Sequence, residues 1–330
     1  MNTRQRYPQL AALGLFALCA LAACGQSGDR SAASRRYLSI GTAPVGGAFF
    51  VVGGALAEVA NQFGDHGWQV TAEATKGSRE NIRRLARGEL DFALSNAAIT
   101  YFAVRGESGW DRAHAVRAVM TLAPNVALFV TPQDSGIETI ADLRGRRVVV
   151  GPAGAGFEMF VGPLVEAHGI SYDDFTPLHN TQAAAVDMLA DGSAEAAFLG
   201  GAVPTASIVR ASSSLEVRFV PFDPEAKAAA LARYPFFAPA IIPAGTYRGQ
   251  SEEYAGLNVG SMHLITAAGA DEVLVYAFTK TIYENRAGVV ERHAAGRAIQ
   301  PQVVVRDTGT PFHPGAVRYY REIGIWPEEP

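Results

Sequence analysis

The chain has 330 residues, of which 48% are hydrophobic and 18% are charged, a composition typical of a folded globular protein and not of a disordered one. This length is enough for two domains of ordinary size. The formal net charge is −4 and the one short basic cluster is RGRR at 144–147, so we expect no nucleic-acid partner.

Residues 1–24 have the pattern of an export signal. Arg4 and Arg6 provide a basic start, and the apolar segment 10–23 is too short to span a membrane as a stable helix. The signal ends in LAACG, which resembles the lipobox of bacterial lipoproteins, and this resemblance implies that Cys24 becomes an acylated N-terminus. The alternative is ordinary signal-peptidase cleavage just before the Ala-Cys pair, which would leave a protein without an anchor.

The cysteine usage favours the lipid anchor. The only other cysteine, Cys19, also lies in the leader, so the mature chain would keep a single cysteine at its first position. A lone cysteine there serves as an attachment point and not as half of an internal disulfide or as a metal ligand. We therefore expect a periplasmic protein held to a membrane surface by lipid, with the polar segment 25–36 as a flexible tether.

The first part of the folded chain alternates strands with helices. Strands are predicted at 37–40, 68–73 and 92–95, each a short apolar or alternating run. Helical spacing of apolar residues follows the first and second strands, and Ser78 is expected to cap the second helix. This order predicts a largely parallel sheet that is covered on both faces.

The middle of the chain repeats this scheme. Strands are predicted at 147–150, 175–178 and 196–199. One helix runs from the glycine turn after the first of these strands to about residue 168, and another covers 181–190. The repetition predicts a second lobe of similar plan.

Two connections between the lobes are expected. The apolar stretch 118–130, interrupted by Pro124 and Asn125, is predicted to be the first crossing. The proline-rich segments 234–239 and 242–247 cannot be helical and are taken to mark the return.

These crossings divide the chain into lobe 1, formed by 37–124 and 243–330, and lobe 2, formed by 125–242. The C-terminal part of lobe 1 is predicted to contain helices at 271–292 and 313–323. Two lobes joined by two connections are the architecture of a binding protein that closes about a hinge.

Four glycine-rich turns follow predicted strands, at 42–50, 74–81, 151–158 and 199–204. Such turns leave backbone N–H groups free at the positive end of a helix, which suits an anion, and they lie beyond the carboxyl ends of the strands, where ligands bind. Any one of them alone is best explained as a tight connection. All four together predict two facing sheets with a small polar molecule between them.

The candidate ligand-binding residues all belong to these turns or to the end of the third strand. They are Gly47, Phe49, Phe50, Lys76, Gly77, Ser78, Asn81, Ser95, Asn96, Gly154, Ala155, Gly156, Phe157, Gly200, Gly201 and Pro204.

Several of these candidates have a second explanation. Ser78 either contacts the ligand or only caps its helix, and Lys76 either pairs with a carboxylate or is solvated. One of Phe49 and Phe50 is expected to form a wall of the cleft while the other packs in the core. Phe157 is also a candidate for the wall of the cleft.

The chain contains no Gly-x-Ser-x-Gly elbow, no His-Glu-x-x-His and no phosphate loop that ends in Gly-Lys-Ser/Thr. Its histidines are scattered without metal-ligand spacing. We therefore expect no catalytic residues, no metal and no cofactor.

An ordered set of segments resembles the TAXI family of solute-binding proteins, which serve tripartite ATP-independent periplasmic (TRAP) transporters. The segments are LSIGTAPVGGAFF at 38–50, GSREN at 77–81, DLRGRRVVVG at 142–151, IPAGTY at 242–247 and FHPGAVRYYRE at 312–322. The resemblance extends from about residue 37 to 324. It implies an α/β, two-lobed type II periplasmic-binding-protein fold with two crossover strands.

The same resemblance implies the function of the chain. It would capture a small organic acid or an amino-acid-like solute and deliver it to a TRAP permease in the membrane, without chemistry of its own. We expect a monomer. The alternative is a partner that presents its closed, ligand-bound form to a membrane sensor kinase, and the sequence does not separate the two roles.

The chain departs from the family in its turns. Where family members commonly have GGTYY and GSGTE, this chain has GGAFF at 46–50 and GAGFE at 154–158, and an acid that is frequent after the third strand is replaced by Ala97. A pocket that loses hydroxyl groups and gains phenyl rings favours a less polar ligand, because an unpaired buried polar group costs about 1–3 kcal/mol. We therefore expect a carboxylate with an apolar body.

Overall fold

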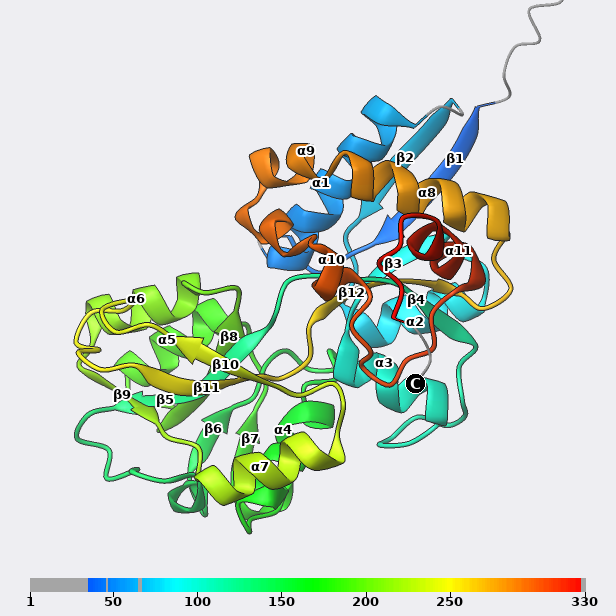
Figure 1. The fold of residues 1–330 in the computed structure, drawn as a ribbon. Coiled ribbons are helices and arrows are strands. Elements are labelled where there is room, and N and C mark those ends of the chain that lie inside the picture. The colour runs from blue at the N-terminus through cyan, green and yellow to red at the C-terminus, as the bar shows by residue number, and fades with distance from the viewer. Residues whose placement is uncertain (1–34, 46, 65–66, 328–330) are drawn as a thin grey trace, which may run out of the picture.

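The computed structural model describes residues 35–45, 47–64 and 67–327. It has the predicted two-lobed α/β fold, in which each lobe is built around its own sheet (Figure 1). Cys24 and the leader lie outside the described residues. No helix among the described residues combines the length and the apolar character that a membrane span needs.

The sheet of lobe 1 has five strands in the order β2-β1-β3-β12-β4. The strand β1 pairs in parallel with β2 and β3, whereas β12 is antiparallel to both β3 and β4. The strands are β1 (Arg36–Gly41), β2 (Trp68–Glu73), β3 (Phe92–Asn96), β4 (Val116–Thr121) and β12 (Met262–Ala267).

The sheet of lobe 2 has the order β10-β11-β5-β8-β6-β7, and β9 also pairs with β5. Only the pairs that involve β6 are parallel. The strands are β5 (Val126–Pro132), β6 (Arg147–Val149), β7 (Thr176–Leu178), β8 (Ala196–Gly201), β9 (Val217–Val220), β10 (Ala238–Ile242) and β11 (Tyr254–Asn258).

The helices cover the sheets as the alternation of strands and helices predicts. Lobe 1 carries α1 (Ala48–Phe63), α2 (Ser78–Ala86), α3 (Ala97–Arg105), α8 (Glu272–Glu284), α9 (Arg286–Arg292), α10 (Pro301–Val304) and α11 (Pro314–Glu322). Lobe 2 carries α4 (Glu158–Ala167), α5 (Gln182–Ala190), α6 (Ala206–Ser214) and α7 (Pro224–Arg233). The helix predicted over 271–292 is divided at Asn285 into α8 and α9.

Two crossings join the lobes, at 122–125 between β4 and β5 and at 259–261 between β11 and β12. They run side by side, because the Val259 N–H donates to Asn125 O at 2.9 Å and the Met262 N–H donates to Ala123 O at 2.9 Å. The side chain of Asn258 adds a third link by accepting the Asn125 N–H at 3.1 Å. The hinge is therefore a short hydrogen-bonded ribbon.

The second crossing falls later in the chain than the return that the sequence predicted at residue 243. The proline-rich segments 234–239 and 242–247 both remain in lobe 2. The strand β10 lies between and within them and pairs antiparallel with β11 at the edge of the lobe 2 sheet. Pro239 is tolerated there, since an edge strand has one side without ladder hydrogen bonds.

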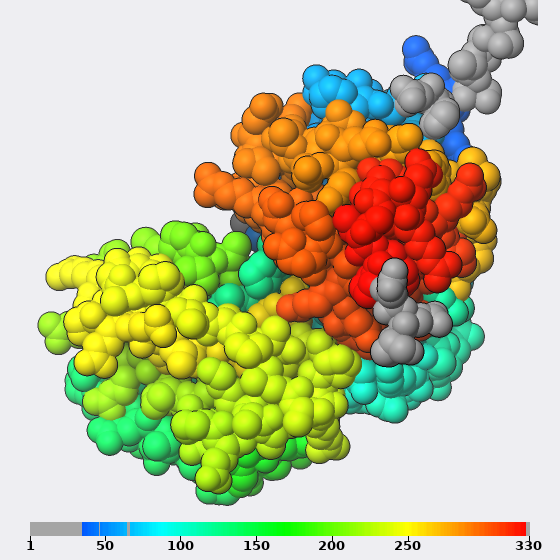
Figure 2. All heavy atoms as spheres, in the orientation of Figure 1, coloured from blue at the N-terminus to red at the C-terminus, as the bar shows by residue number. Residues whose placement is uncertain are grey.

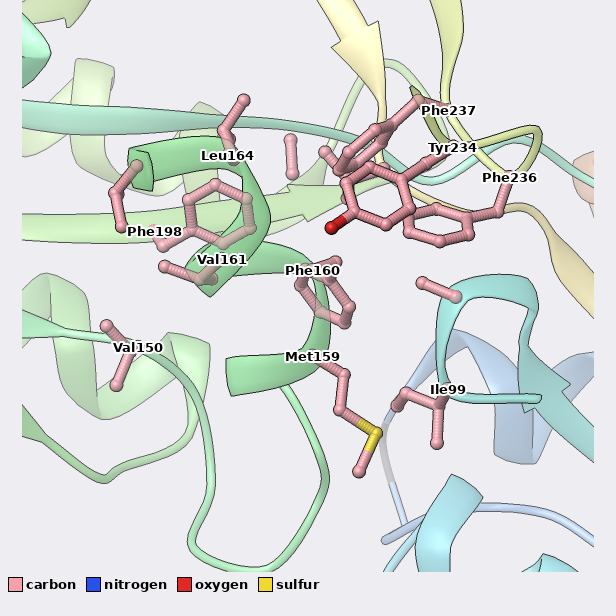
Figure 3. Close-up of a cluster of buried hydrophobic side chains, with 14 of the residues drawn as sticks. Ile99, Val150, Met159, Phe160, Val161, Leu164, Phe198, Tyr234, Phe236 and Phe237 are labelled. Carbon is pink, nitrogen blue, oxygen red and sulfur yellow. The ribbon is translucent and has the colours of Figure 1, made fainter. Parts of the chain in front are cut away.

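One buried cluster extends across the boundary between the lobes. It includes Ile99 and Phe102 from α3 of lobe 1, together with Met159 and Phe160 from α4 of lobe 2. Figure 3 shows the Met159 side chain pointing toward Ile99. The lobes are thus in apolar contact along α3 and α4.

We expect the second crossing to need a glycine at position 260. Gly260 has φ +116, and a Cβ there would collide with the Asn96 side chain. Gly260→Ala should lower the free energy of unfolding by about 2 kcal/mol or more in a urea titration, from backbone strain plus the displaced hydrogen bonds of Asn96. Gly269→Ala is the matched control, because a Cβ at that turn meets nothing within 4 Å. Equal stability of the two variants would contradict this account of the hinge.

Candidate functional site

The glycine turns gather at one edge of each sheet. In lobe 1 the parallel strands β1, β2 and β3 end together, and in lobe 2 the parallel strands β6 and β8 end together. Figure 2 shows a recess on this face between α6 of lobe 2, in green, and the orange segment around α9 and α10 of lobe 1. The carboxyl ends of parallel strands are where open α/β folds bind ligands.

The first turn starts from a buried threonine and ends in an apolar rim. The hydroxyl and the N–H of Thr42 both donate to Glu73 O, at 2.7 and 2.9 Å, which joins the ends of β1 and β2. Gly47, the N-cap of α1, is exposed and has no side chain to cap the helix. Val45 beside it is 74% exposed and Val51 in α1 is 41% exposed.

The two phenylalanines of this turn differ in their surroundings. Phe49 packs against the core of lobe 1, together with the buried residues of α1 and α8. Phe50 is also half-buried but is not part of that packing. Phe50 is therefore the better candidate for a wall of the cleft.

The second turn is fixed by polar side chains that bond to the protein itself. Gly77 has φ +111, a conformation that favours glycine, and its N–H donates to Thr75 Oγ1 at 3.1 Å. Gly77, not Ser78, is the N-cap of α2, so the predicted capping role of Ser78 is wrong. The Ser78 hydroxyl instead accepts the Asn96 N–H at 3.0 Å, because the start of α2 packs against the end of β3.

The side chains of Asn81 and Asn96 also form hydrogen bonds within the protein. The Asn81 amide donates to Thr42 O at 2.7 Å and to Leu94 O at 2.8 Å, which ties α2 to β1 and β3. The Asn96 side chain caps α3 by accepting the Ala98 N–H and donates to Gly260 O at the second crossing.

The remaining candidates of lobe 1 are Ser95 and Lys76. The Ser95 hydroxyl is buried and accepts a hydrogen bond from Thr100 at 2.8 Å. Lys76 is exposed, and among the described residues its ammonium group forms no ion pair or hydrogen bond. The structure therefore brings the polar candidates of lobe 1 together, mainly as internal ties. Among the described candidates of this lobe, the Lys76 ammonium group and the buried Asn81 Oδ1 have no hydrogen-bond partner.

The third turn lies against lobe 1. Gly154 is exposed, whereas Ala155 and Gly156 are buried. A Cβ on Gly156 would stand 3.0 Å from Ile99 Cδ1 and 3.1 Å from Arg79 Cγ, so glycine permits the close approach of the two lobes. The ring of Phe157 covers Gly151 and lies 4.9 Å from the ring of Phe160, so Phe157 is half-buried within lobe 2.

The fourth turn is held by a residue that the sequence did not single out. The side chain of Gln182 accepts the Gly200 N–H at 3.0 Å and donates to Gly200 O at 2.9 Å. Gly201 is half-buried, and Pro204, which is exposed, follows a cis peptide bond. The only signal for Gln182 was its place in the first turn of a predicted helix.

An ion pair bridges the lobes next to the third turn. Arg79 Nη1 lies 2.7 Å from Glu158 Oε1, and Arg79 Nη2 donates to Gly109 O at 2.8 Å. The guanidinium also lies 5.3 Å from the centroid of the Trp110 ring. Both charges fall inside the predicted turns, but no feature of the sequence indicated that they would pair.

A polar cluster is buried beside the crossings, in a place that the sequence did not predict. His263 Nε2 lies 3.2 Å from Thr121 Oγ1 and 2.9 Å from Thr308 Oγ1. Burial and the positive charge of Arg306 lower the pKa of His263 to about 3, so its ring is neutral. Arg306 Nη2 donates to Ser261 Oγ at 2.9 Å.

A cavity of about 550 Å³ lies between the lobes on the side of α3, α4 and α7. It is lined by Tyr101, Glu107, Glu158, Glu166, Tyr172 and Arg233, among others. None of the candidate ligand-binding residues lines it. No cluster of metal-ligating side chains occurs in the part of the chain that the structure describes.

Two sheets that present their carboxyl edges to each other, joined by two short crossings, define the two-lobed periplasmic-binding-protein fold. Residues 40–324 match the model of the NMT1-like family, and the chain belongs to that family. This finding supports the solute-binding part of the TAXI resemblance. It does not single out the TAXI family itself or a TRAP permease.

Solved structures share the fold at low identity. PhnD1 from Prochlorococcus marinus (MIT 9301), in complex with methylphosphonate, has a TM-score of 0.54 and 10% identity over 87% of this chain and 96% of that chain. XAC2383 from Xanthomonas citri, bound to ATP, has a TM-score of 0.50 and 11% identity over 87% and 95%. The alkanesulfonate-binding protein SsuA from Xanthomonas axonopodis pv. citri has a TM-score of 0.43 and 16% identity over 88% and 80%.

We expect the Arg79–Glu158 pair to bias the lobes toward the closed arrangement. Glu158→Gln removes the charge at nearly constant size and should favour opening by about 1 kcal/mol, or roughly five-fold, since the pair is partly exposed. The distance distribution between nitroxide labels on the exposed residues Ala86 and Ala190 would then broaden toward longer separations.

The control for this prediction is Glu166→Gln. Glu166 is on the same helix and lines the same cavity, but no ion pair forms between it and the described residues. Identical distributions for the wild type and Glu158→Gln would show that the apolar contact alone holds the lobes together.

Proposed function

We propose that this protein is an extracytoplasmic solute-binding protein that captures a small carboxylate between its lobes. Membership of the NMT1-like family and the two-lobed fold support this role. The observation that carries it is the arrangement of the two hydrogen-bonded crossings, which turn the glycine-rich edges of both sheets toward one recess. The backbone N–H groups at the starts of α1 and α2 would face the anionic group.

We further propose that the protein acts in the periplasm, anchored to a membrane through Cys24, and that it delivers its ligand to a TRAP permease. The resemblance of the ordered motifs to the TAXI family supports this partner. Two rivals use the same fold. One is uptake of a phosphonate or sulfonate through an ABC-type permease, and the similarity to PhnD1, solved in complex with methylphosphonate, favours this rival. The other is presentation of the closed form to a sensor kinase.

The rim of the recess supports a ligand with an apolar body. Phe50, Val45 and Val51 place apolar surface at the first turn, on the side where family members commonly carry hydroxyl groups. The polar candidates behind them already bond to the protein. An apolar group of the ligand would therefore meet side chains that lose nothing on desolvation, whereas a second carboxylate would find few free donors.

A thermal-shift screen would test this function. The chain from Gly25 onward, freed of bound solute by unfolding and refolding, is mixed with glutamate, 2-oxoglutarate, hexanoate, phenylacetate, ethanesulfonate and methylphosphonate. A ligand at 100 times its Kd should stabilise the protein by about 2.7 kcal/mol and raise its midpoint clearly. We expect hexanoate or phenylacetate to give the largest shift.

Each other result of the screen is informative. A larger shift with glutamate would keep the function and overturn the apolar body. A larger shift with methylphosphonate or ethanesulfonate would favour the ABC-type rival. No shift with any of the six acids would contradict the proposed capture of a small carboxylate.

Phe50 and Phe49 should respond differently to truncation. Phe50→Ala removes apolar surface from the rim and should weaken binding of the best monocarboxylate by about ten-fold, the equivalent of roughly 1.4 kcal/mol. Phe49→Ala removes part of the lobe 1 core and should lower the free energy of unfolding while the affinity of the folded protein changes little. Calorimetric titration and urea unfolding of both variants would separate the two effects, and an unchanged affinity in Phe50→Ala would remove Phe50 from the site.

A further inference from the structure

Arg306 lies where lobe 1 meets the hinge. It follows α10 in sequence, and its carbonyl oxygen accepts a hydrogen bond from Thr121 at the end of β4, at 3.1 Å. Its side chain reaches Ser261 in the second crossing, 45 residues away in the sequence. The guanidinium therefore sits at the cleft-side edge of the lobe 1 sheet, next to the segment that moves when the lobes close.

The charge of Arg306 is not balanced by any described residue. Among the described residues, no carboxylate lies within ion-pair distance of it. Its Nε is buried without a hydrogen-bond partner, and its Nη1 forms no hydrogen bond either, although that atom is not buried. Burial lowers the pKa of Arg306, and no carboxylate opposes the shift.

Among the described residues, the side chain that accepts a hydrogen bond from Arg306 is uncharged, and the carboxylate of the adjacent Asp307 accepts the Gly309 N–H instead. Ser261 Oγ also accepts from the Asn258 amide at 2.9 Å, and His263 is neutral. Arg306 is half-buried, so part of its guanidinium, Nε included, is removed from water, and a single hydroxyl group replaces that solvation only in part. A bound anion would offset the rest.

The other cations near the recess do not have this property. Arg79 is neutralised by Glu158 across the lobe boundary. Lys76, one of the candidates from the sequence, is exposed, so water already solvates its charge and an anion would gain little from it.

We propose that Arg306 binds the anionic group of the solute at the hinge end of the recess. This inference rests on the proposed function and names the residue that makes the site selective for anions. Because Ser261 and Asn258 connect the guanidinium to both crossings, the anion would also be tied to the segment about which the lobes close. A guanidinium whose exposed Nη1 has no hydrogen bond suits carboxylate, sulfonate and phosphonate groups alike.

The test uses calorimetric titration with whichever of the six acids stabilises the wild type most. Arg306→Gln should weaken the binding of this acid by at least ten-fold. Arg306→Lys keeps the charge but loses the planar guanidinium, so its affinity should lie between those of the wild type and Arg306→Gln. Arg297→Gln is the matched control, since Arg297 is an exposed arginine in the same C-terminal part of lobe 1. Wild-type affinity in Arg306→Gln would overturn the inference and leave the proposed function intact.

A second measurement keeps the inference testable if no acid of the screen binds. Sulfate is titrated into wild type and Arg306→Gln at constant ionic strength, and the unfolding midpoints are followed. We expect a saturable rise in the wild type that is absent from the variant, whereas parallel curves would overturn the inference.

If Arg306→Gln does not fold, a crystal structure of the wild type with the bound acid tests the inference instead. The anionic group should lie within hydrogen-bond distance of the Arg306 guanidinium, and an anionic group seated elsewhere would overturn the inference.

Discussion

The pairing of the two crossings is the constraint on which the rest of the molecule depends. Backbone hydrogen bonds between 122–125 and 259–261, with the Asn258 side chain added, hold the ends of two separate sheets in one ribbon. Gly260 makes this ribbon possible, since the Asn96 side chain that caps α3 occupies the space where a Cβ would stand. Asn96, at the end of β3, is therefore linked directly to the hinge through Gly260.

The boundary between the lobes has two parts of different character. Along α3 and α4 it is apolar, and the buried cluster of Ile99, Phe102, Met159 and Phe160 makes the larger contribution, since buried apolar area is worth roughly 25 cal/mol per Å² whereas a partly exposed ion pair is worth at most about 1 kcal/mol. The Arg79–Glu158 pair contributes less free energy to this contact, but its geometry favours one relative orientation of the lobes. Apart from Lys76, the candidate side chains of the turns beyond it are small, apolar or bonded within the protein.

Much of the candidate site could be predicted from the sequence, but not the use of its side chains. The turns at 42–50, 74–81, 151–158 and 199–204 follow strands that end at shared edges, as their glycines and the strand order indicated. Ser78, Asn81 and Asn96 were expected to offer polar atoms to a ligand, and they instead hold β1, β3, α2 and α3 together. Hydrogen-bond partners are distant in sequence, so the residue type alone cannot show whether a polar group is free.

The sequence by itself determined the two-lobed α/β fold, because hydrophobic periodicity and glycine turns are local features that specify strands, helices and their order. Only the tertiary structure decided where the chain returns to lobe 1. The proline-rich sequence around β10 is compatible with a crossing or with an edge strand, and the pairing of β10 with β11 makes it an edge strand of lobe 2. The tertiary structure also selected Arg306. An arginine is distinguished by burial and by the absence of a carboxylate partner among the described residues, and both depend on residues far away in the chain.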